Sequence, residues 1–272
     1  MNEQGTISER ASQYGDGLFE TIAIRDGEPR LWTYHIERLQ EGCQRLGFDA
    51  PDPDELRSRL DVLLGSTDED TTQCIAKIIV SAVATERGYG RGVASPTETW
   101  CAIFPALPLE RSAYDSGIAT MLCETRLATG STSAGLKTLN RLEQVLARSE
   151  CIQSGAFEGL TLDADGRIIC GTMSNVFIVR DNQVMTPALL RCGVAGIMRR
   201  LVIEALRDAG TPAQIGDVGV EDLAAADEVF ITNSQLGAVP VQRCGEHQWP
   251  VGPVTQRVMG MLAERGIQEC RP

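Results

Sequence analysis

The sequence predicts a mixed α/β protein built from two domains, and three observations support this prediction. Segments with strand-like and helix-like apolar spacing alternate along the chain. A proline-rich stretch at residues 105–109 interrupts both periodicities, as is typical of a linker. The chain has 272 residues, and 43% of them are apolar, which allows one large domain or two of ordinary size. We therefore expect one domain over residues 1–108, a linker over residues 109–115 and a second domain over residues 116–272.

The first third of the chain alternates short strands with helices. Two apolar runs flank the turn-forming residues Asp26 and Gly27, which predicts a hairpin. Ile36, Leu39 and Cys43 recur at helical spacing. The expected elements are strands at residues 18–24, 75–83 and 99–104, a second hairpin arm at residues 29–31, and helices at residues 32–46 and 53–64.

Beyond the linker, strands and helices are expected to alternate again. Asn140 stands at the start of a helical pattern and Glu143 follows three residues later, which is the spacing of a capping box. Leu142, Val145 and Leu146 fall on one face of that helix. The expected elements are strands at residues 119–122, 159–162, 168–169, 175–179 and 228–232, and helices at residues 140–151, 197–209 and 255–265.

The composition argues against several classes of function. A net charge of −12 disfavours nucleic acid and anionic membranes as partners, because both bind basic surfaces. Nine cysteines without a CxxC pair or a histidine cluster indicate reduced thiols, not a disulfide framework or a zinc site. No apolar run reaches the ~18 residues of a membrane helix, and no export signal follows Met1. We expect a cytoplasmic protein without a bound metal, in which an anionic small molecule would need local arginines.

Lysine is almost absent from the chain. Of its 25 basic residues, only Lys77 and Lys137 are lysines. An arginine can serve in place of a lysine at most surface positions. Its guanidinium stays protonated, however, whereas a lysine amine can lose its proton and form a Schiff base. Lys137 lies in a turn of small residues just before the helix expected at residues 140–151. That position suits a covalent cofactor anchor, so Lys137 is the candidate catalytic residue.

The residues around Lys137 resemble those of a known family. The segment LKTLNRLEQVLAR, residues 136–148, looks like the cofactor-lysine motif of the 4-amino-4-deoxychorismate lyases, members of the fold-type IV, class IV aminotransferase-like family of pyridoxal 5′-phosphate (PLP) proteins. Similar segments extend from residues 10–21 to residues 239–241 in the family's order. The resemblance implies a two-domain α/β fold with a smaller N-terminal domain and a larger PLP-binding C-terminal domain with a barrel-like sheet. It further implies PLP in the cleft between the domains and a homodimer.

The resemblance also nominates residues for the cofactor phosphate. A dianionic phosphate requires a fixed guanidinium and backbone N–H groups at a helix start. The segment HIERL resembles the family's HxxRL element, which implies that Arg38 contacts the phosphate. The glycine turn GVAGIMR nominates the backbone amides of Ile197 and Met198, and the segment TNSQ nominates the hydroxyl of Ser234.

Three further residues are nominated for the substrate and the cofactor ring. Arg91, at the end of the GYGRG loop, matches the family's arginine that approaches the substrate carboxylates, although Val93 replaces the usual tyrosine of the RGY triplet. Asn140 is a candidate contact of the cofactor's phenolic oxygen or of the substrate. Cys170 replaces the family's usual glutamate, which pairs with the pyridine nitrogen. Because a thiol is mostly neutral at pH 7, we expect a cofactor that accepts electrons less strongly.

The implied activity is that of a PLP-dependent carbon–oxygen lyase. Lys137 is expected to hold PLP covalently and, once freed, to remove a ring proton from 4-amino-4-deoxychorismate. Loss of the enolpyruvyl side chain then gives pyruvate and 4-aminobenzoate, a folate precursor. The alternative is a D-amino-acid or branched-chain aminotransferase of the same fold, against which the residues NRLEQ after Thr138-Leu139 argue. A non-catalytic or altered paralogue is a further alternative, because Cys170 and Val93 depart from the family pattern.

The two lysines give a matched pair of variants. Lys137→Ala should abolish covalent attachment of PLP, because the anchoring amine is gone. Lys77→Arg should leave attachment intact. The absorbance of the protein-bound cofactor measures both, and borohydride trapping with peptide mass mapping locates the modified residue. Loss of bound cofactor in Lys77→Arg, with retention in Lys137→Ala, would instead assign the covalent attachment to Lys77.

Overall fold

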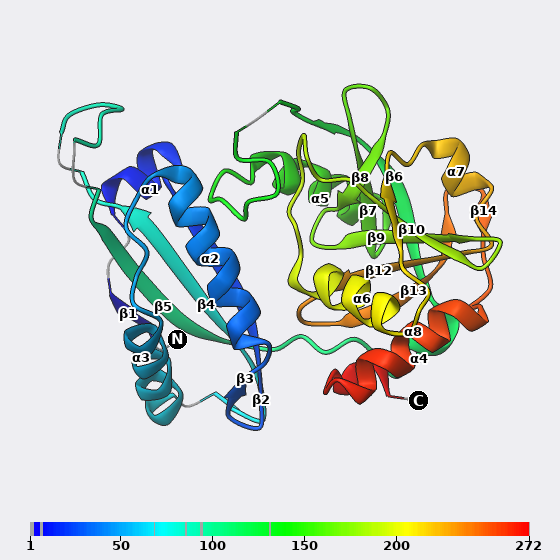
Figure 1. The fold of residues 1–272 in the computed structure, drawn as a ribbon, viewed down its shortest axis with the longest axis horizontal. Coiled ribbons are helices and arrows are strands. Elements are labelled where there is room, and N and C mark those ends of the chain that lie inside the picture. The colour runs from blue at the N-terminus through cyan, green and yellow to red at the C-terminus, as the bar shows by residue number, and fades with distance from the viewer. Residues whose placement is uncertain are drawn as a thin grey trace. The chain divides into compact units, whose positions relative to one another are not determined.

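The computed structural model describes residues 3–5, 8–67, 69–84, 86–92, 95–130 and 132–271, and it divides into two compact units (Figure 1). The first unit comprises Met1–Leu107 together with Leu136–Asn140, and the second comprises Pro108–Gly135 together with Arg141–Pro272. The short segment that carries Lys137 thus packs with the first unit, although it lies within residues 116–272, the range expected for the second domain.

The first unit is an antiparallel sheet with the strand order β1-β5-β4-β2-β3. Its strands are β1 (Glu3–Gly5), β2 (Gly17–Arg25), β3 (Glu28–Pro29), β4 (Gln73–Ala82) and β5 (Thr97–Pro105), and its helices are α1 (Glu9–Tyr14), α2 (Trp32–Leu46) and α3 (Pro53–Ser66). Alternate residues of β2, among them Leu18, Ile22 and Ile24, pack with the buried sides of α2 and α3 in one core. The predicted hairpin is confirmed, with Asp26 and Gly27 at positive φ in its turn.

The second unit is built on a curled sheet. Its strand order is β11-β10-β9-β12-β13-β6-β7-β8, with β14 paired to β13, and the pairs β13–β6, β6–β7 and β10–β11 are parallel. The strands are β6 (Ile118–Leu127), β7 (Glu158–Asp163), β8 (Ile168–Gly171), β9 (Asn175–Arg180), β10 (Gln183–Pro187), β11 (Gln214–Gly216), β12 (Glu228–Asn233), β13 (Gly237–Cys244) and β14 (His247–Gln248). At the end of this order, β8 runs through a short turn into β9, where the Gly171 N–H donates to the Ser174 carbonyl at 2.8 Å. The sheet therefore curls back toward its other end.

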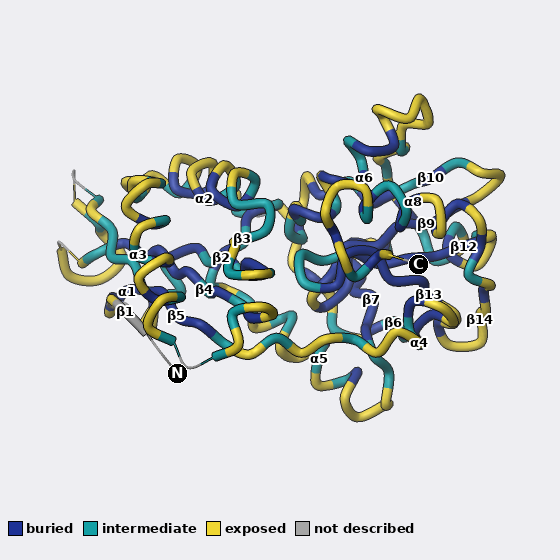
Figure 2. Tube along the Cα trace, turned by 90° about the horizontal axis from the view of Figure 1, so that it is seen from below, coloured by how far each residue is buried: buried dark blue, intermediate teal, exposed yellow. Residues whose placement is uncertain are grey.

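Helices cover the curled sheet and complete the core of the second unit. They are α4 (Arg111–Ser116), α5 (Leu142–Ser154), α6 (Ile197–Asp208), α7 (Val220–Ala224), α8 (Pro253–Glu264) and the 3₁₀ helix η1 (Gln268–Cys270). Phe177 and Phe230, on neighbouring strands, stack with their ring centroids 4.8 Å apart. The strands are largely buried, whereas the outer sides of the helices and many loops are exposed (Figure 2). Among the described residues, no helix is long and apolar enough to cross a membrane.

The start of helix α5 differs from the prediction. The helix begins at Leu142 with Arg141 at its N-cap, and no side chain caps it. The Asn140 amide instead donates to the carbonyl of Gly15 at 3.0 Å, and the Glu143 carboxylate accepts from a backbone N–H of the preceding loop at 3.0 Å. The predicted capping box is therefore wrong, because both side chains bind backbone groups elsewhere.

The apolar face predicted for α5 is exposed. Leu142, Val145, Leu146 and Ile152 are 70%, 58%, 51% and 71% exposed, and we call these four residues the α5 apolar face. The helix buries its opposite side, including Ala147 and Cys151, against β6 and β7. The apolar spacing thus identified the helix but not the side on which it packs.

The stretch expected to be a linker is structured. Helix α4 occupies much of residues 109–115 and continues to Ser116. Its Tyr114 side chain is buried and donates its hydroxyl hydrogen bond to the carbonyl of Leu236 at 3.0 Å. Residues just after the chain enters the second unit therefore contribute to that unit's core.

Candidate active site

Strand β2 holds the backbone on both sides of Lys137. The Phe19 N–H donates to the Lys137 carbonyl at 3.0 Å, and the Leu139 N–H donates to the Gly17 carbonyl at 3.0 Å. The neighbours Leu136 and Thr138 are buried, and Thr138 forms an antiparallel bridge with β2. These contacts fix the position of Lys137 although it lies outside any regular helix or strand.

Both lysines of the chain approach the ring of Phe19. The Lys137 Nζ lies 4.1 Å from the ring centre, and the Nζ of Lys77, on the neighbouring strand β4, lies 5.4 Å from it. An ammonium group at these distances is attracted to the ring face. The aromatic ring therefore helps to direct the Lys137 side chain.

Arg38 is bound by a buried carboxylate on β2. Its Nε and Nη2 donate to the Glu20 carboxylate at 2.8 and 2.5 Å, one to each oxygen. The Nδ1 of His35, one turn earlier on α2, lies 2.6 Å from the same carboxylate. Glu20 is 1% exposed and His35 is 0% exposed. The structure thus places the predicted phosphate ligand Arg38 in a buried ionic cluster.

The charges in this cluster follow from burial and pairing. Burial alone would raise the pKa of Glu20, but Arg38 and His35 outweigh it and hold that pKa at about 2. Burial lowers the pKa of His35, and the cations Arg38 and Lys137 lower it further against the opposing effect of Glu20. His35 is therefore neutral near pH 7, with its proton on the Nδ1 that faces the carboxylate.

In the second unit, Asn175 shapes the turn before helix α6. Its side-chain Oδ1 accepts from the Gly196 N–H at 3.1 Å, and its Nδ2 donates to the Val194 carbonyl at 2.9 Å. Gly196 is the N-cap of α6, so no side chain caps the helix. The backbone N–H groups of Ile197 and Met198 therefore lie at a helix start, where N–H groups lack intrahelical acceptors and can bind an anion.

A cation without a carboxylate partner lies in the first turn of α6. The Arg199 guanidinium donates to the Thr186 hydroxyl at 3.3 Å and to the Pro187 carbonyl at 3.0 Å, and within the described ranges it forms no ion pair. Burial lowers its pKa to about 10, so it stays charged at pH 7. Because buried charges normally have counter-charges, this arginine favours an anion near the start of α6.

The turn between β12 and β13 carries Ser234. Asn233 shapes this turn, because its side-chain oxygen accepts from the N–H groups of Gln235 and Leu236 at 2.9 and 2.8 Å. The hydroxyl of Thr232 is buried without a hydrogen-bond partner among the residues that the structure describes. As far as the structure describes the chain, the hydroxyl lacks a hydrogen-bond partner, the helix start lacks a side-chain cap and Arg199 lacks a carboxylate partner, and these features fit a phosphate group.

Cys170 is a buried, neutral thiol on β8. It packs with Leu127, Ile169, Leu189 and Cys192. Burial raises its pKa to about 11, although Thr161 and Arg141 act in the opposite direction. Position 170 therefore offers no negative charge at pH 7, as we expected from the sequence.

The Arg91 guanidinium is occupied within its own unit. Its Nε and Nη2 donate to the Asp16 carboxylate at 2.9 and 2.6 Å, its Nη1 donates to the Leu46 carbonyl, and it stacks on the Phe48 ring. A substrate carboxylate would have to compete with Asp16 for this arginine. Val93 lies outside the described residues.

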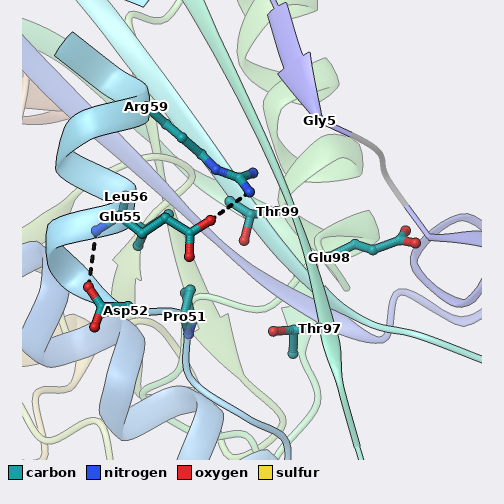
Figure 3. A pocket seen from close by; sticks show the side chains of 9 residues that line it. All are labelled: Gly5, Pro51, Asp52, Glu55, Leu56, Arg59, Thr97, Glu98 and Thr99. Atoms are coloured by element: carbon teal, nitrogen blue, oxygen red, sulfur yellow. Dashed lines mark hydrogen bonds and ion pairs between the residues drawn. The ribbon is translucent and has the colours of Figure 1, made fainter. Parts of the chain in front are cut away.

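A separate cavity of about 420 Å³ lies between α3 and β5 in the first unit (Figure 3). Its charged side chains are partly paired with one another, since Arg59 donates to Glu55 at 2.8 Å. Asp52 caps the start of α3. None of the predicted site residues lines this cavity, so it is distinct from the candidate active site.

The sequence interpretation missed three residues that contact or adjoin predicted site residues of their own unit: Glu20, Asn175 and Arg199. A usable signal existed for Glu20, because it is a carboxylate in the same alternating row as Leu18, Ile22 and Ile24. A charge at a core position requires a partner. For Asn175 and Arg199 the sequence offers no comparable signal, since the groups they bind lie in other elements.

Comparisons with known proteins show the family to which the chain is similar. The family described as amino-transferase class IV matches residues 17–244. The chain is 37% identical over 262 residues to the aminodeoxychorismate lyase of Vibrio harveyi, covering 94% of each chain. It is 30% identical over 230 residues to a putative branched-chain-amino-acid aminotransferase of Methanocaldococcus jannaschii, covering 84% of this chain and 78% of the relative.

A solved structure is similar to the whole chain. The crystal structure of 4-amino-4-deoxychorismate lyase from Pseudomonas aeruginosa has a TM-score of 0.90 and 39% sequence identity, covering 98% of this chain and 100% of that one. The predicted fold class, mixed α/β of fold-type IV with a barrel-like sheet, is confirmed by this similarity.

Gly196→Ala tests the anion site at α6. A Cβ at this position would lie 2.0 Å from the Asn175 Oδ1, so either the turn or the Asn175 side chain that holds it must shift. We expect roughly tenfold weaker binding of PLP, measured by titration of the apoprotein, because each amide–phosphate hydrogen bond depends on the turn. The matched control is Gly260→Ala in α8, where an added Cβ meets nothing within 4 Å and binding should not change. Equal affinity in both variants would contradict the assignment.

Proposed function

Because the chain belongs to the amino-transferase class IV family, we propose that it is a PLP-dependent lyase that converts 4-amino-4-deoxychorismate to 4-aminobenzoate and pyruvate. The resemblance inferred from the sequence is confirmed by the full-length relatives. The observation that carries the proposal is the position of Lys137, which strand β2 fixes and Phe19 directs, in a segment that resembles the family's cofactor-lysine motif.

The chain's own residues supply the groups that PLP requires. When bound, PLP accepts the electron pair that remains when the substrate loses a proton. Lys137 is the proposed covalent anchor, and Arg38 and the first amides of α6, those of Ile197 and Met198, are the proposed phosphate ligands. Ser234 is the proposed hydroxyl donor to the phosphate.

The remaining predicted residues keep their proposed roles. We assign Cys170 to the surroundings of the pyridine nitrogen, Asn140 to the phenolic oxygen or the substrate, and Arg91 to a substrate carboxylate. The neutral Cys170 thiol supports a reaction that needs little electron withdrawal, since formation of an aromatic product favours elimination. To bind Arg91, a substrate carboxylate must compete with the Asp16 carboxylate for the guanidinium.

Lys137 also moves the protons of the proposed reaction. Once the substrate amine has replaced it, the Lys137 amine is the proton acceptor for the ring carbon beside the substrate nitrogen. The same group, or water, returns a proton as the enolpyruvyl side chain leaves. The Phe19 ring, 4.1 Å from Nζ, covers the amine on one side.

Transamination is the second candidate activity. The similarity to a putative branched-chain-amino-acid aminotransferase favours it, but that similarity is weaker than the similarity to the lyases. A non-catalytic role was motivated by Cys170 and Val93. Binding of PLP without turnover of any amine substrate would support that third reading.

We propose a homodimer in the cytoplasm that acts on a small anionic substrate. The α5 apolar face supports the dimer, because four large apolar side chains of one helix are exposed together. All nine cysteines are free and buried, which suits a reducing compartment. The arginines and lysine proposed above supply the cations for an anionic substrate.

Assay of both products tests the proposed activity. With 4-amino-4-deoxychorismate, the wild-type protein should release pyruvate and 4-aminobenzoate in equal amounts. Lys137→Ala should lower the rate by roughly 10²- to 10⁴-fold, because it removes both the anchor and the proton acceptor. Cys170→Glu, assayed beside the wild type, should increase keto-acid-dependent amine transfer relative to elimination. Amine transfer by the wild type without pyruvate release would contradict the proposal and favour the aminotransferase.

Leu146→Glu tests the dimer. A carboxylate in the centre of the α5 apolar face should shift the protein to a monomer, because the dimer would bury this charge without a partner. Size-exclusion chromatography with light scattering measures the shift. Val62→Glu is the matched control: Val62 is similarly exposed, at 58%, but lies on α3. A wild-type monomer, or a Leu146→Glu dimer as stable as the control, would rule out this interface.

A further inference from the structure

Glu20 stands where the fold favours an apolar residue. Its neighbours on the same face of β2, Leu18, Ile22 and Ile24, all belong to the core of the first unit. Burying a carboxylate in such a row is costly unless partners bind it. Glu20 receives donors at both oxygens, from Arg38 and from His35.

The two bonds from Arg38 fix its guanidinium in orientation as well as in position. A guanidinium is a rigid planar fork of five N–H groups. Glu20 binds the edge formed by Nε and Nη2 with one oxygen on each nitrogen. A single bond would leave the plane free to rotate, whereas two bonds determine it. The other donor edge, formed by Nη1 and the second N–H of Nη2, is therefore held in a fixed direction that differs from the direction of Glu20.

His35 holds Glu20 from a second side. Its Nδ1 lies 2.6 Å from the carboxylate, and its ring is fully buried. Because Nδ1 carries the proton, Nε2 is an acceptor, and it has no hydrogen-bond partner in the part of the chain that the structure describes. The histidine therefore bonds through one nitrogen only, toward Glu20, which limits the rotation of the carboxylate.

We propose that Glu20 is a positioning residue that fixes Arg38 so that the other donor edge of the guanidinium binds the phosphate of the cofactor. This inference rests on the proposed function, because it takes PLP as the ligand and Arg38 as its phosphate contact. Glu20 itself does not touch the phosphate. It acts by holding Arg38 in the bound orientation before the ligand arrives, which removes an ordering cost from binding.

Charge and positioning predict opposite effects for the same substitution. Glu20 is negative, so by charge alone its neutralisation should strengthen binding of a dianionic phosphate nearby. If its main role is to orient Arg38, neutralisation should weaken that binding instead. The sign of the change therefore separates the two roles.

The experiment compares PLP with pyridoxal, which has the aldehyde but lacks the phosphate. For each variant, the dissociation constants of both compounds are measured by titration of the folded apoprotein. In Glu20→Gln, we expect the preference for PLP over pyridoxal to fall by about tenfold or more, with pyridoxal affinity nearly unchanged. If Glu20 had a purely structural role, the substitution would weaken the binding of both compounds alike, or would lower only the melting temperature of the protein.

A second variant applies if Glu20→Gln does not fold. Arg38→Lys keeps a cation beside Glu20, so the carboxylate stays paired, but an ammonium group offers no second planar edge. It should lower the preference for PLP similarly. The matched control is Asp163→Asn, which neutralises another buried carboxylate bound by an arginine, Arg167 at 2.8 Å, in the second unit. This control should lower the melting temperature but keep the preference.

The outcomes separate this inference from the proposed function. If the wild-type protein bound neither PLP nor pyridoxal, the proposed function would fail and the inference with it. If the wild type preferred PLP and Glu20→Gln kept or increased that preference, the inference alone would be overturned. An unchanged preference in Arg38→Lys would remove Arg38 from the proposed phosphate ligands and would overturn the inference, which depends on that contact.

Discussion

The candidate site depends on the hydrogen bonds that join the backbone around Lys137 to strand β2. They hold a segment without regular structure against the start of the strand. Successive residues of β2 then point to opposite faces: Phe19 meets the Lys137 amine, and Glu20 enters the core to bind Arg38. One strand thus orients both the amine and the guanidinium, and neither group depends on a flexible loop.

Local charge at the site differs from the charge of the whole molecule. The chain carries a net charge of −12, yet each unit has an arginine among or beside the residues that are proposed to bind the phosphate. Arg38 is charge-balanced by Glu20, whereas Arg199 has no carboxylate partner among the described residues and lies in the first turn of a helix whose start already favours anions. Burial strengthens such short-range interactions, while the distant surface carboxylates are screened by water and salt.

Features that depend on local sequence were predictable, and those that depend on distant partners were not. The scarcity of lysine indicated Lys137, and apolar spacing gave α2 and most strands of both units. The cap assigned to Asn140 was wrong because a carbonyl 125 positions away in sequence binds its amide. Strand β13 was missed because it contains Pro240, and a proline argues against a central strand. The structure tolerates this proline because the neighbouring strand β6 pairs with β13 only from Val241 onward, so Pro240 has an adjacent strand on one side only. Asn175 has a role only because the chain returns at Gly196.

The path of the chain between its two units has a consequence for synthesis on the ribosome. Leu136–Asn140 returns to the first unit after the second has begun, so the chain passes between the units three times. A nascent chain ending at Leu107 has already made β2, but the backbone groups of Gly17 and Phe19 lack the partners that arrive with residues 137–139. Such an unpaired edge can bind other chains. Completion of the N-terminal unit therefore waits until more than half of the polypeptide has been translated.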